Sequence, residues 1–228
     1  MPASETAFRA GVTRPAALPW LTAGSAALCI AASLGLLPPW LAFIFKPMTT
    51  VLVIAYAWPR GHGMPRQHRL ILFGLALSLA GDVFLLWPKQ GFLPGLVSFL
   101  LAHLAYIVAF CVPVRFAAKP STFIAYAALA ALILSQLWEG VPAALRAPVL
   151  AYVVCLAAMA AQAATWWRSA PNNPHARWAA IGGLLFMASD SLLAFNKFAA
   201  PLPWSALWIL ATYWLAQWCI ASSLSRAP

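Results

Sequence analysis

Eight apolar runs, each about as long as a helix that crosses a bilayer, take up almost the whole sequence. Roughly twenty predominantly apolar residues are needed to span the hydrocarbon core, and connectors that contain proline separate the runs. The chain is 64% hydrophobic and only 8% charged, which excludes a soluble globular domain. The predicted spans are residues 17–37, 40–58, 69–87, 92–113, 121–138, 147–167, 178–198 and 203–224.

The sequence therefore predicts an all-α membrane protein with eight transmembrane helices. Residues 1–16 are expected to form a short cytoplasmic N-terminal tail, and residues 17–224 a single transmembrane domain. Arg9 and Arg14 precede the first apolar run. That run is too long for a signal-peptide core and has no clear cleavage site, so we expect it to be the first span.

The distribution of basic residues predicts the orientation in the membrane. The net charge is +10, but the basic residues stand singly in short loops and form no basic stripe, which argues against a nucleic-acid partner. Eight spans place both termini on one side, and most basic residues fall on that side, so we expect cytoplasmic termini in the inner cell membrane. The predicted cytoplasmic set is Arg9, Arg14, Arg60, Arg66, Arg69, Arg115, Lys119, Arg168, Arg177 and Arg226, against Lys89, Arg146 and Lys197 outside.

Cysteine and histidine positions predict neither a metal nor another cofactor. The four cysteines are far apart in apolar runs and have no metal-ligand or redox spacing. Three of the four histidines, His62, His68 and His175, fall in predicted loops, so a three-histidine zinc centre cannot assemble within the membrane.

Two of the four acidic residues interrupt the apolar runs. Glu5 and Glu139 lie outside the runs, whereas Asp82 and Asp190 lie inside the third and seventh. A charged side chain in hydrocarbon costs several kcal/mol, and such residues therefore mark functional sites by default. Shifting the third span by 108 residues superposes Asp82 on Asp190, together with five further matches. The shift predicts two parallel four-helix repeats, although six matches between apolar helices also arise by chance.

Further polar residues fall at similar estimated depths. At about 1.5 Å of rise per residue, Asp82, Asp190 and Lys46 lie in the outer half of their spans. His103, Tyr106, Tyr213 and Gln217 fall near the middle of theirs, and Ser189 and Asn196 lie on a helical stripe next to that of Asp190. We expect one cavity in the central to outer membrane. Lys89 and Lys197 are expected to extend to the interface.

Structural roles and acid–base chemistry are both compatible with this set. The aspartates can pair with Lys46 and hold helices together, and His103 can be a satisfied core histidine. Alternatively, two carboxyl groups in a site of low dielectric constant allow one to stay protonated while the other ionises, which suits general acid–base catalysis. On the residues alone, a hydrolase and a proton-coupled carrier of small solutes remain comparable alternatives, and a structural subunit is a third.

Five segments resemble, in order, the signature segments of the YhhN family, which includes the animal transmembrane lysoplasmalogenases. They are FKPMT at 45–49, GDVFLL at 81–86, FLLAHLAY at 99–106, GLLFMASD at 183–190 and YWLAQ at 213–217. The resemblance extends from about the second span to the last.

The resemblance implies an eight-helix hydrolase without a cofactor that uses water to cleave the vinyl ether bond of a membrane lysophospholipid. The products would be a fatty aldehyde and a glycerophospho-base. A bacterial member could act on another lipid or ether. The implied catalytic residues are Asp82, Asp190, His103, Tyr106 and Tyr213, and the implied substrate-binding residues are Lys46, Ser189, Asn196 and Gln217.

Overall fold

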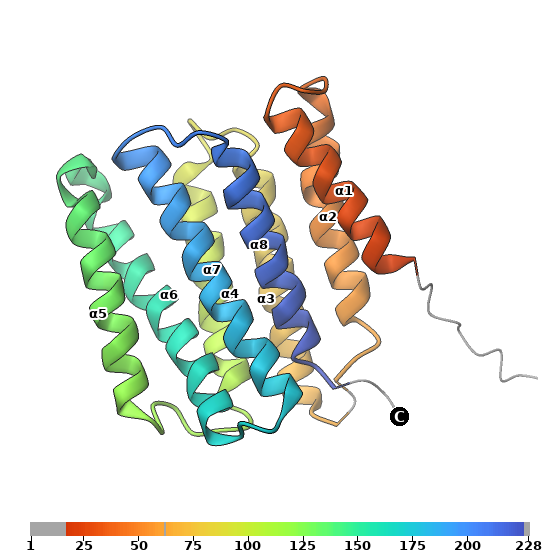
Figure 1. The fold of residues 1–228 in the computed structure, drawn as a ribbon, viewed down its shortest axis with the longest axis vertical. Helices are drawn as coiled ribbons and strands as arrows, with labels where there is room; N and C mark the ends of the chain where they lie inside the picture. The colour runs from red at the N-terminus through yellow and green to blue at the C-terminus, as the bar shows by residue number, and fades with distance from the viewer. Residues whose placement is uncertain (1–16, 62, 226–228) are drawn as a thin grey trace, which may run out of the picture.

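A computed structural model describes residues 17–61 and 63–225. The predicted N-terminal tail, residues 1–16, lies outside the described residues. Eight α-helices and one 3-10 helix form within the described part, at the positions of the eight apolar runs, which confirms the all-α architecture (Figure 1). They are α1 (Leu18–Ser33), α2 (Trp40–Ala57), α3 (Pro65–Phe84), α4 (Phe92–Phe110), α5 (Pro120–Leu137), η1 (Trp138–Gly140), α6 (Ala143–Ser169), α7 (Pro174–Phe198) and α8 (Ser205–Ser222).

Five of these helical segments are both long and apolar enough to cross a bilayer. They are α2, α4, α5 with η1, α6 and α7. In contrast, α1 has 16 residues and is shorter than a full span, and α3 and α8 have the length but not the same apolarity. The structure thus supports a multi-pass membrane protein, while the count of eight spans stays a prediction.

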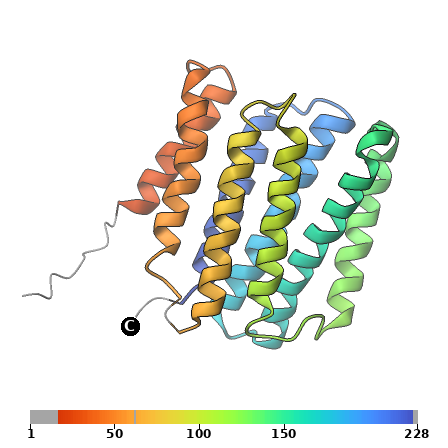
Figure 2. The same cartoon turned by 180° about the vertical axis from the view of Figure 1, so that it is seen from behind.

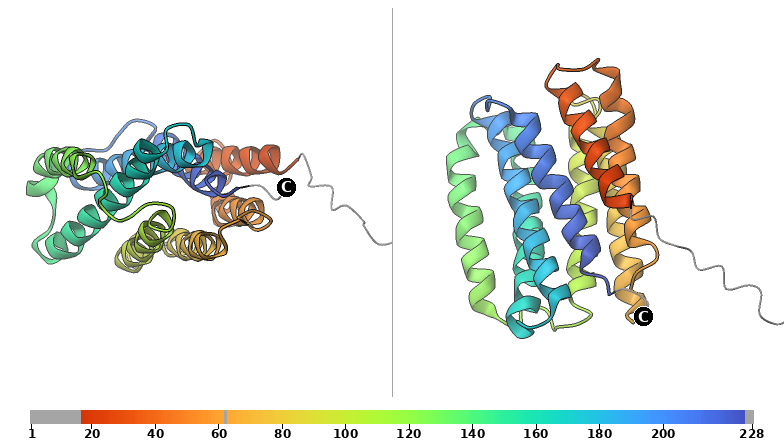
Figure 3. Two further views of the ribbon diagram at one scale, coloured as in Figure 1. Left: turned by 90° about the horizontal axis from the view of Figure 1, so that it is seen from below. Right: turned by 45° about the vertical axis from the view of Figure 1, so that its right-hand side comes forward.

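Successive helices run antiparallel, so α1 starts and α8 ends at the same end of the bundle (Figure 1). Viewed along the helices, α2, α3 and α4 form one row, and α6, α7 and α8 lie across from it (Figure 3). The row of α2, α3 and α4 is also seen from behind (Figure 2). Helix α1 lies at one edge of the bundle and α5 at the other. The orientation in the membrane and the internal repeat stay predictions.

Small residues allow the helices to approach closely where they cross. A Cβ atom on Gly74 of α3 would lie 2.3 Å from the Tyr106 ring of α4, and one on Gly81 would lie 2.6 Å from the Phe99 ring. On α7, a Cβ atom at Gly183 would lie 3.0 Å from the Ala160 backbone of α6. Since lipid tails are as apolar as the side chains, such close van der Waals packing is what favours helix association in a membrane.

The Gly74→Ala variant is expected to lower the unfolding midpoint in detergent, by an amount equivalent to about 1–3 kcal/mol, the usual cost of overpacking. The new methyl group meets the Tyr106 ring, which cannot move away freely because its hydroxyl is hydrogen-bonded to Gln217. Gly24→Ala on α1 is the matched control, because no atom of the residues that the structure describes lies within 4 Å of the added carbon. Equal midpoints for the two variants would contradict the packing argument.

Candidate functional site

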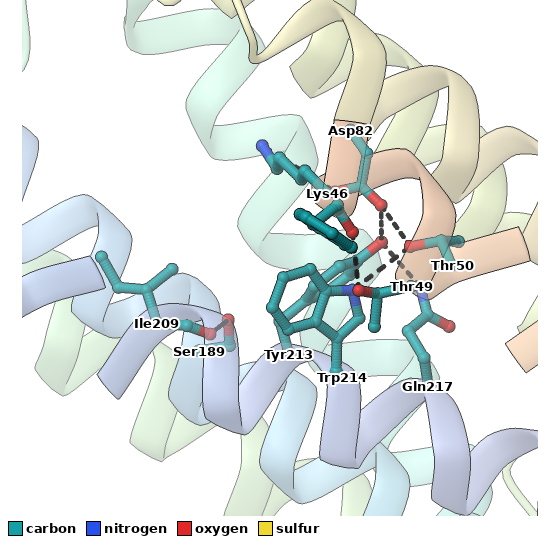
Figure 4. Close-up of polar contacts among 10 residues, drawn as sticks. Lys46, Thr49, Thr50, Asp82, Ser189, Ile209, Tyr213, Trp214 and Gln217 are labelled. Atoms are coloured by element: carbon teal, nitrogen blue, oxygen red, sulfur yellow. Dashed lines mark hydrogen bonds and ion pairs between the residues drawn. The ribbon is translucent and has the colours of Figure 1, made fainter. Parts of the chain in front are cut away.

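The Asp82 carboxylate joins three helices. Asp82 on α3 is 1% exposed. Its Oδ2 atom accepts hydrogen bonds from Thr50 Oγ1 of α2 at 2.6 Å and from the Tyr213 hydroxyl of α8 at 2.7 Å. Its Oδ1 atom lies 3.9 Å from Lys46 Nζ, one turn before Thr50 on α2 (Figure 4). Two donors and one ammonium group therefore compensate a buried carboxylate.

A chain of hydrogen bonds extends from this carboxylate deeper into the bundle. Gln217 donates from Nε2 to the Tyr213 hydroxyl at 3.3 Å, and the Tyr106 hydroxyl donates to Gln217 Oε1 at 2.8 Å. Trp214 donates from Nε1 to Thr50 Oγ1 at 3.3 Å (Figure 4). We refer to Lys46, Thr50, Asp82, Tyr106, Tyr213, Trp214 and Gln217 as the Asp82 network. Its members orient one another, so the direction of the Tyr213 hydroxyl is fixed.

Asp190 has a different environment. It lies on α7, is half-buried, and accepts a short hydrogen bond from the Tyr152 hydroxyl of α6. Lys46–Asp82 is the one salt bridge among the residues that the structure describes, so Asp190 faces no cation at ion-pair distance. The two carboxyl groups are thus held by different tyrosines and differ in their charge partners.

Both aspartates line one cavity of about 420 Å³, to which α2 through α8 all contribute. Its polar lining includes Lys46, Asp82, Tyr152, Asp190 and Tyr213, together with Ser189, Ser191, Asn196, Lys197 and Ser205. The rest is largely apolar, and four lining residues come from α5, namely Ala130, Ile133, Leu134 and Leu137. A cavity that combines an apolar wall with a few convergent polar groups is typical of a small-molecule or lipid site.

Three of the residues expected in the cavity do not line it. His103, Tyr106 and Gln217 are all fully buried, because their faces of α4 and α8 turn toward neighbouring helices. Tyr106 and Gln217 reach the cavity only through the hydroxyl of Tyr213. The His103 ring packs edge-on against Phe186 and Tyr152, and neither ring nitrogen has a hydrogen-bond partner within the described part of the chain.

Ser189 and Asn196 line the cavity, but their side chains bond to neighbouring backbone. Ser189 Oγ donates to the Ile209 carbonyl at 3.0 Å, which joins α7 to α8 (Figure 4). Asn196 Oδ1 accepts from the Leu202 amide at 2.9 Å and so fixes the loop between these helices. Both therefore support the cavity wall.

The sequence profile of the YhhN family matches residues 41–224. The chain belongs to the YhhN family. It is 32% identical over 192 residues to human lysoplasmalogenase TMEM86B, covering 83% of this chain and 77% of that protein. It is also 32% identical over 202 residues to human lysoplasmalogenase TMEM86A, with coverage of 84% and 82%. An uncharacterized membrane protein YhhN from Escherichia coli O157:H7 is 28% identical over 153 residues, with coverage of 67% and 72%. No solved structure matches the chain significantly.

Sequence reasoning missed one cavity residue of this YhhN-family protein, Tyr152. A tyrosine inside an apolar run is usually a packing residue with one hydrogen bond. The depth of Tyr152 along its helix could have indicated its contact with Asp190. Tyr152 lies nine residues from the start of α6 at Ala143, and Asp190 lies eight residues from the end of α7 at Phe198. Because adjacent antiparallel helices share this end of the bundle, the two side chains fall at one level.

The described residues of the YhhN-family protein include no group of three or more His, Cys, Asp or Glu side chains placed to hold a metal ion. The free cysteines Cys29, Cys111, Cys155 and Cys219 lie on four different helices or their ends. The ionisable groups at the cavity are therefore two carboxyl groups, two tyrosine hydroxyls and the ammonium groups of Lys46 and Lys197. This set can transfer protons and stabilise a cation.

The Tyr213→Phe variant is expected to lower the stability of the YhhN-family protein by about 1.5–3 kcal/mol, the usual cost of losing a hydrogen bond to a charged group. Asp82 loses a donor and Gln217 loses an acceptor. Thermal unfolding in detergent measures the change. Tyr126→Phe on α5 is the matched control, because that half-buried hydroxyl makes no hydrogen bond within the described residues. Similar midpoints for both variants would show that the Asp82 network contributes little to stability.

Proposed function

We propose that this protein is a membrane hydrolase that cleaves the vinyl ether bond of lysoplasmalogen-like lipids. One observation carries the proposal: two carboxyl groups, each hydrogen-bonded by its own tyrosine, face one largely apolar cavity inside the helix bundle. Two human relatives, each 32% identical to this chain over more than four fifths of its length, are named lysoplasmalogenases. No cofactor is required by the reaction that follows.

The substrate class follows from the cavity and its location. A lysoplasmalogen has one hydrocarbon chain, joined to glycerol by a vinyl ether, and one phosphate-containing headgroup. The apolar α5 wall suits the chain, and the polar part suits the ether. The cavity lies toward the end of the bundle that carries Lys89, Arg146 and Lys197, which the basic-residue asymmetry assigns to the outer side of an inner membrane with cytoplasmic termini.

The reaction begins with transfer of a proton from a carboxylic acid to the β-carbon of the vinyl ether. The C=C electron pair forms the new C–H bond, and the α-carbon and ether oxygen share the positive charge of an oxocarbenium ion. Water then adds to the α-carbon and gives a proton to a carboxylate. In the collapse of the hemiacetal, the carboxyl group that took the proton from water gives it to the ether oxygen as the bond between that oxygen and the α-carbon breaks. The carboxylate of the first acid takes the proton of the hemiacetal hydroxyl, and a fatty aldehyde and the free glycerol hydroxyl are released. The acid is restored and no net proton is consumed.

The two aspartates are suited to different steps. Asp82 accepts two hydrogen bonds and faces Lys46, and all three partners stabilise its ionised form. We assign it as the carboxylate that stabilises the cation and activates water. Within the described part of the chain, Asp190 has no cation partner and one hydroxyl donor. We assign it as the protonated general acid, and Tyr152 as the residue that orients it.

The other residues of the site act on these two. Lys46 holds Asp82 ionised, and Tyr213 orients it toward the cavity. Tyr106 and Gln217 fix the Tyr213 hydroxyl from behind. His103 supports the Tyr152 ring by packing, and Ser189 and Asn196 hold the α7–α8 wall in place. All nine residues that the family resemblance implied thus have a part in the proposal, but only the two aspartates carry protons.

The Asp82→Asn and Asp190→Asn variants are each expected to lose aldehyde release by about 10²–10⁴-fold, the usual contribution of a general acid or base. The assay incubates purified protein with a lysoplasmalogen and, separately, with an ester lysolipid, and quantifies aldehyde and fatty acid. Glu139→Gln is the control, because this exposed carboxylate in η1 lies outside the cavity lining.

A folded, membrane-inserted Asp→Asn variant with full activity would remove that aspartate from the mechanism. If the wild type releases fatty acid from the ester lysolipid but no aldehyde from the lysoplasmalogen, the protein is a hydrolase that does not cleave vinyl ethers. If the wild type releases neither product, the proposed function fails, and pH-dependent solute uptake into sealed proteoliposomes would identify a carrier instead.

A further inference from the structure

We propose that Lys197 binds the phosphate of the lipid headgroup at the mouth of the cavity. The proposal rests on the proposed function and adds what the site selects: a single-chain lipid with a phosphate group on glycerol, in preference to the uncharged alkenylglycerol. Lys197 is separate from the carboxyl groups that react, and its role is in binding specificity.

The position of Lys197 follows from the helical repeat of α7. Lys197 lies seven residues after Asp190, which places the two on one face of the helix. Ala194, between them, also lines the cavity, so this face of α7 forms a continuous part of the wall. Seven residues correspond to about 10 Å along the helix axis. Lys197 is therefore at the end of the same wall on which Asp190 lies deeper.

Two lysines of the described residues line the cavity, and of these Lys197 is the one available to an anion. Lys46 lies 3.9 Å from Asp82 and is 14% exposed, so its charge is already compensated. Lys197 is exposed, and no carboxylate of the described residues lies within ion-pair distance of it. Its Nζ atom instead lies 4.0 Å from the ring centroid of Phe92 and 5.9 Å from that of Phe198, both of which line the cavity. The aromatic faces hold the ammonium group at the mouth without neutralising it.

The covalent structure of the substrate matches this arrangement. In a lysoplasmalogen, three glycerol carbons and one ester oxygen separate the vinyl ether oxygen from the phosphorus atom, so the phosphate lies within one short linker of the reacting bond. The flexible four-carbon stem of Lys197 can reach back along α7 toward that phosphate. With the vinyl ether at Asp190, the headgroup faces the mouth and the hydrocarbon chain faces Ile133 and Ala130 of α5.

The test measures binding of lipids that cannot react. A radiolabelled 1-O-alkyl lysophosphocholine, whose saturated ether is not cleaved by this chemistry, is displaced from protein in nanodiscs by its unlabelled form, by 1-O-alkylglycerol of equal chain length, and by glycerophosphocholine. The proteins are the wild type, Lys197→Ala, Lys197→Arg and Lys89→Ala. Lys89 is the matched control, because it is an exposed lysine in the α3–α4 loop at the same end of the bundle, and it does not line the cavity.

Lys197→Ala is expected to weaken binding of the alkyl lysophosphocholine about tenfold and to leave alkylglycerol affinity unchanged, which corresponds to the loss of one charge interaction. For Lys197→Arg and Lys89→Ala, the affinity for the alkyl lysophosphocholine is expected to stay within about threefold of the wild-type value. Glycerophosphocholine should compete in the wild type at high concentration and not in Lys197→Ala, which assigns the contact to the headgroup.

If Lys197→Ala loses affinity for the alkyl lysophosphocholine and for the alkylglycerol by the same factor, the proposal is overturned. Such a result would indicate damage to the cavity and not loss of a phosphate contact. Unchanged affinity for the phosphate lipid, or absence of binding to the wild type, would overturn it as well. Because these lipids are not hydrolysed, the result does not depend on aldehyde release. A wild type that prefers the phosphate lipid but releases no aldehyde would refute the proposed function alone.

Discussion

Burial of the Asp82 carboxylate is the constraint on which the centre of the structure depends. An ionised carboxylate loses far more by leaving water than one hydrogen bond returns, so it needs several partners at once. Thr50 and Lys46 supply them from α2 and Tyr213 from α8. The requirement thus fixes the rotation of α2 and α8 relative to α3, which apolar packing against lipid leaves less well defined. Thr50 in turn accepts from Trp214, so the same contact also sets the register of these helices along their axes.

The two carboxyl groups of the cavity illustrate how one bundle gives the same side chain different properties. Asp82 sits among donors and a cation, whereas Asp190 has a single tyrosine and is half-buried. Enzymes that use paired carboxyl groups commonly separate their roles through such differences in environment. Here the difference arises because α2 contributes a lysine on the Asp82 side and α6 contributes only a tyrosine on the Asp190 side.

The positions of the helices could be predicted from apolarity, and the contacts of the site only in part. Helix α3 begins at Pro65, four residues before the predicted 69, because its first turn is polar and extends beyond any apolar run. Helix α6 begins at Ala143 and keeps Pro148 inside, where the sequence predicts a start at 147. Lys46 and Asp82 were identifiable because charges are rare in such segments. Tyr152 was not, because the partner of a tyrosine depends on the rotation of its helix, and that rotation is set by packing.

Helix α5 is attached to the bundle unevenly. Near its start, Ser121 and Thr122 both accept hydrogen bonds from Arg168 of α6. Along the rest of its length, no side-chain hydrogen bond joins it to another helix within the described residues, and this is the part that lines the cavity. Displacing that part exchanges apolar contacts for contacts with lipid tails of similar polarity, whereas displacing α2 or α8 would strip partners from a buried charge. The α5 wall of the cavity can therefore move at a small free-energy cost, whereas the wall formed by α2 and α8 cannot. Widening the gap beside α5 would admit a hydrocarbon chain sideways from the bilayer while the hydrogen bonds around Asp82 keep their geometry.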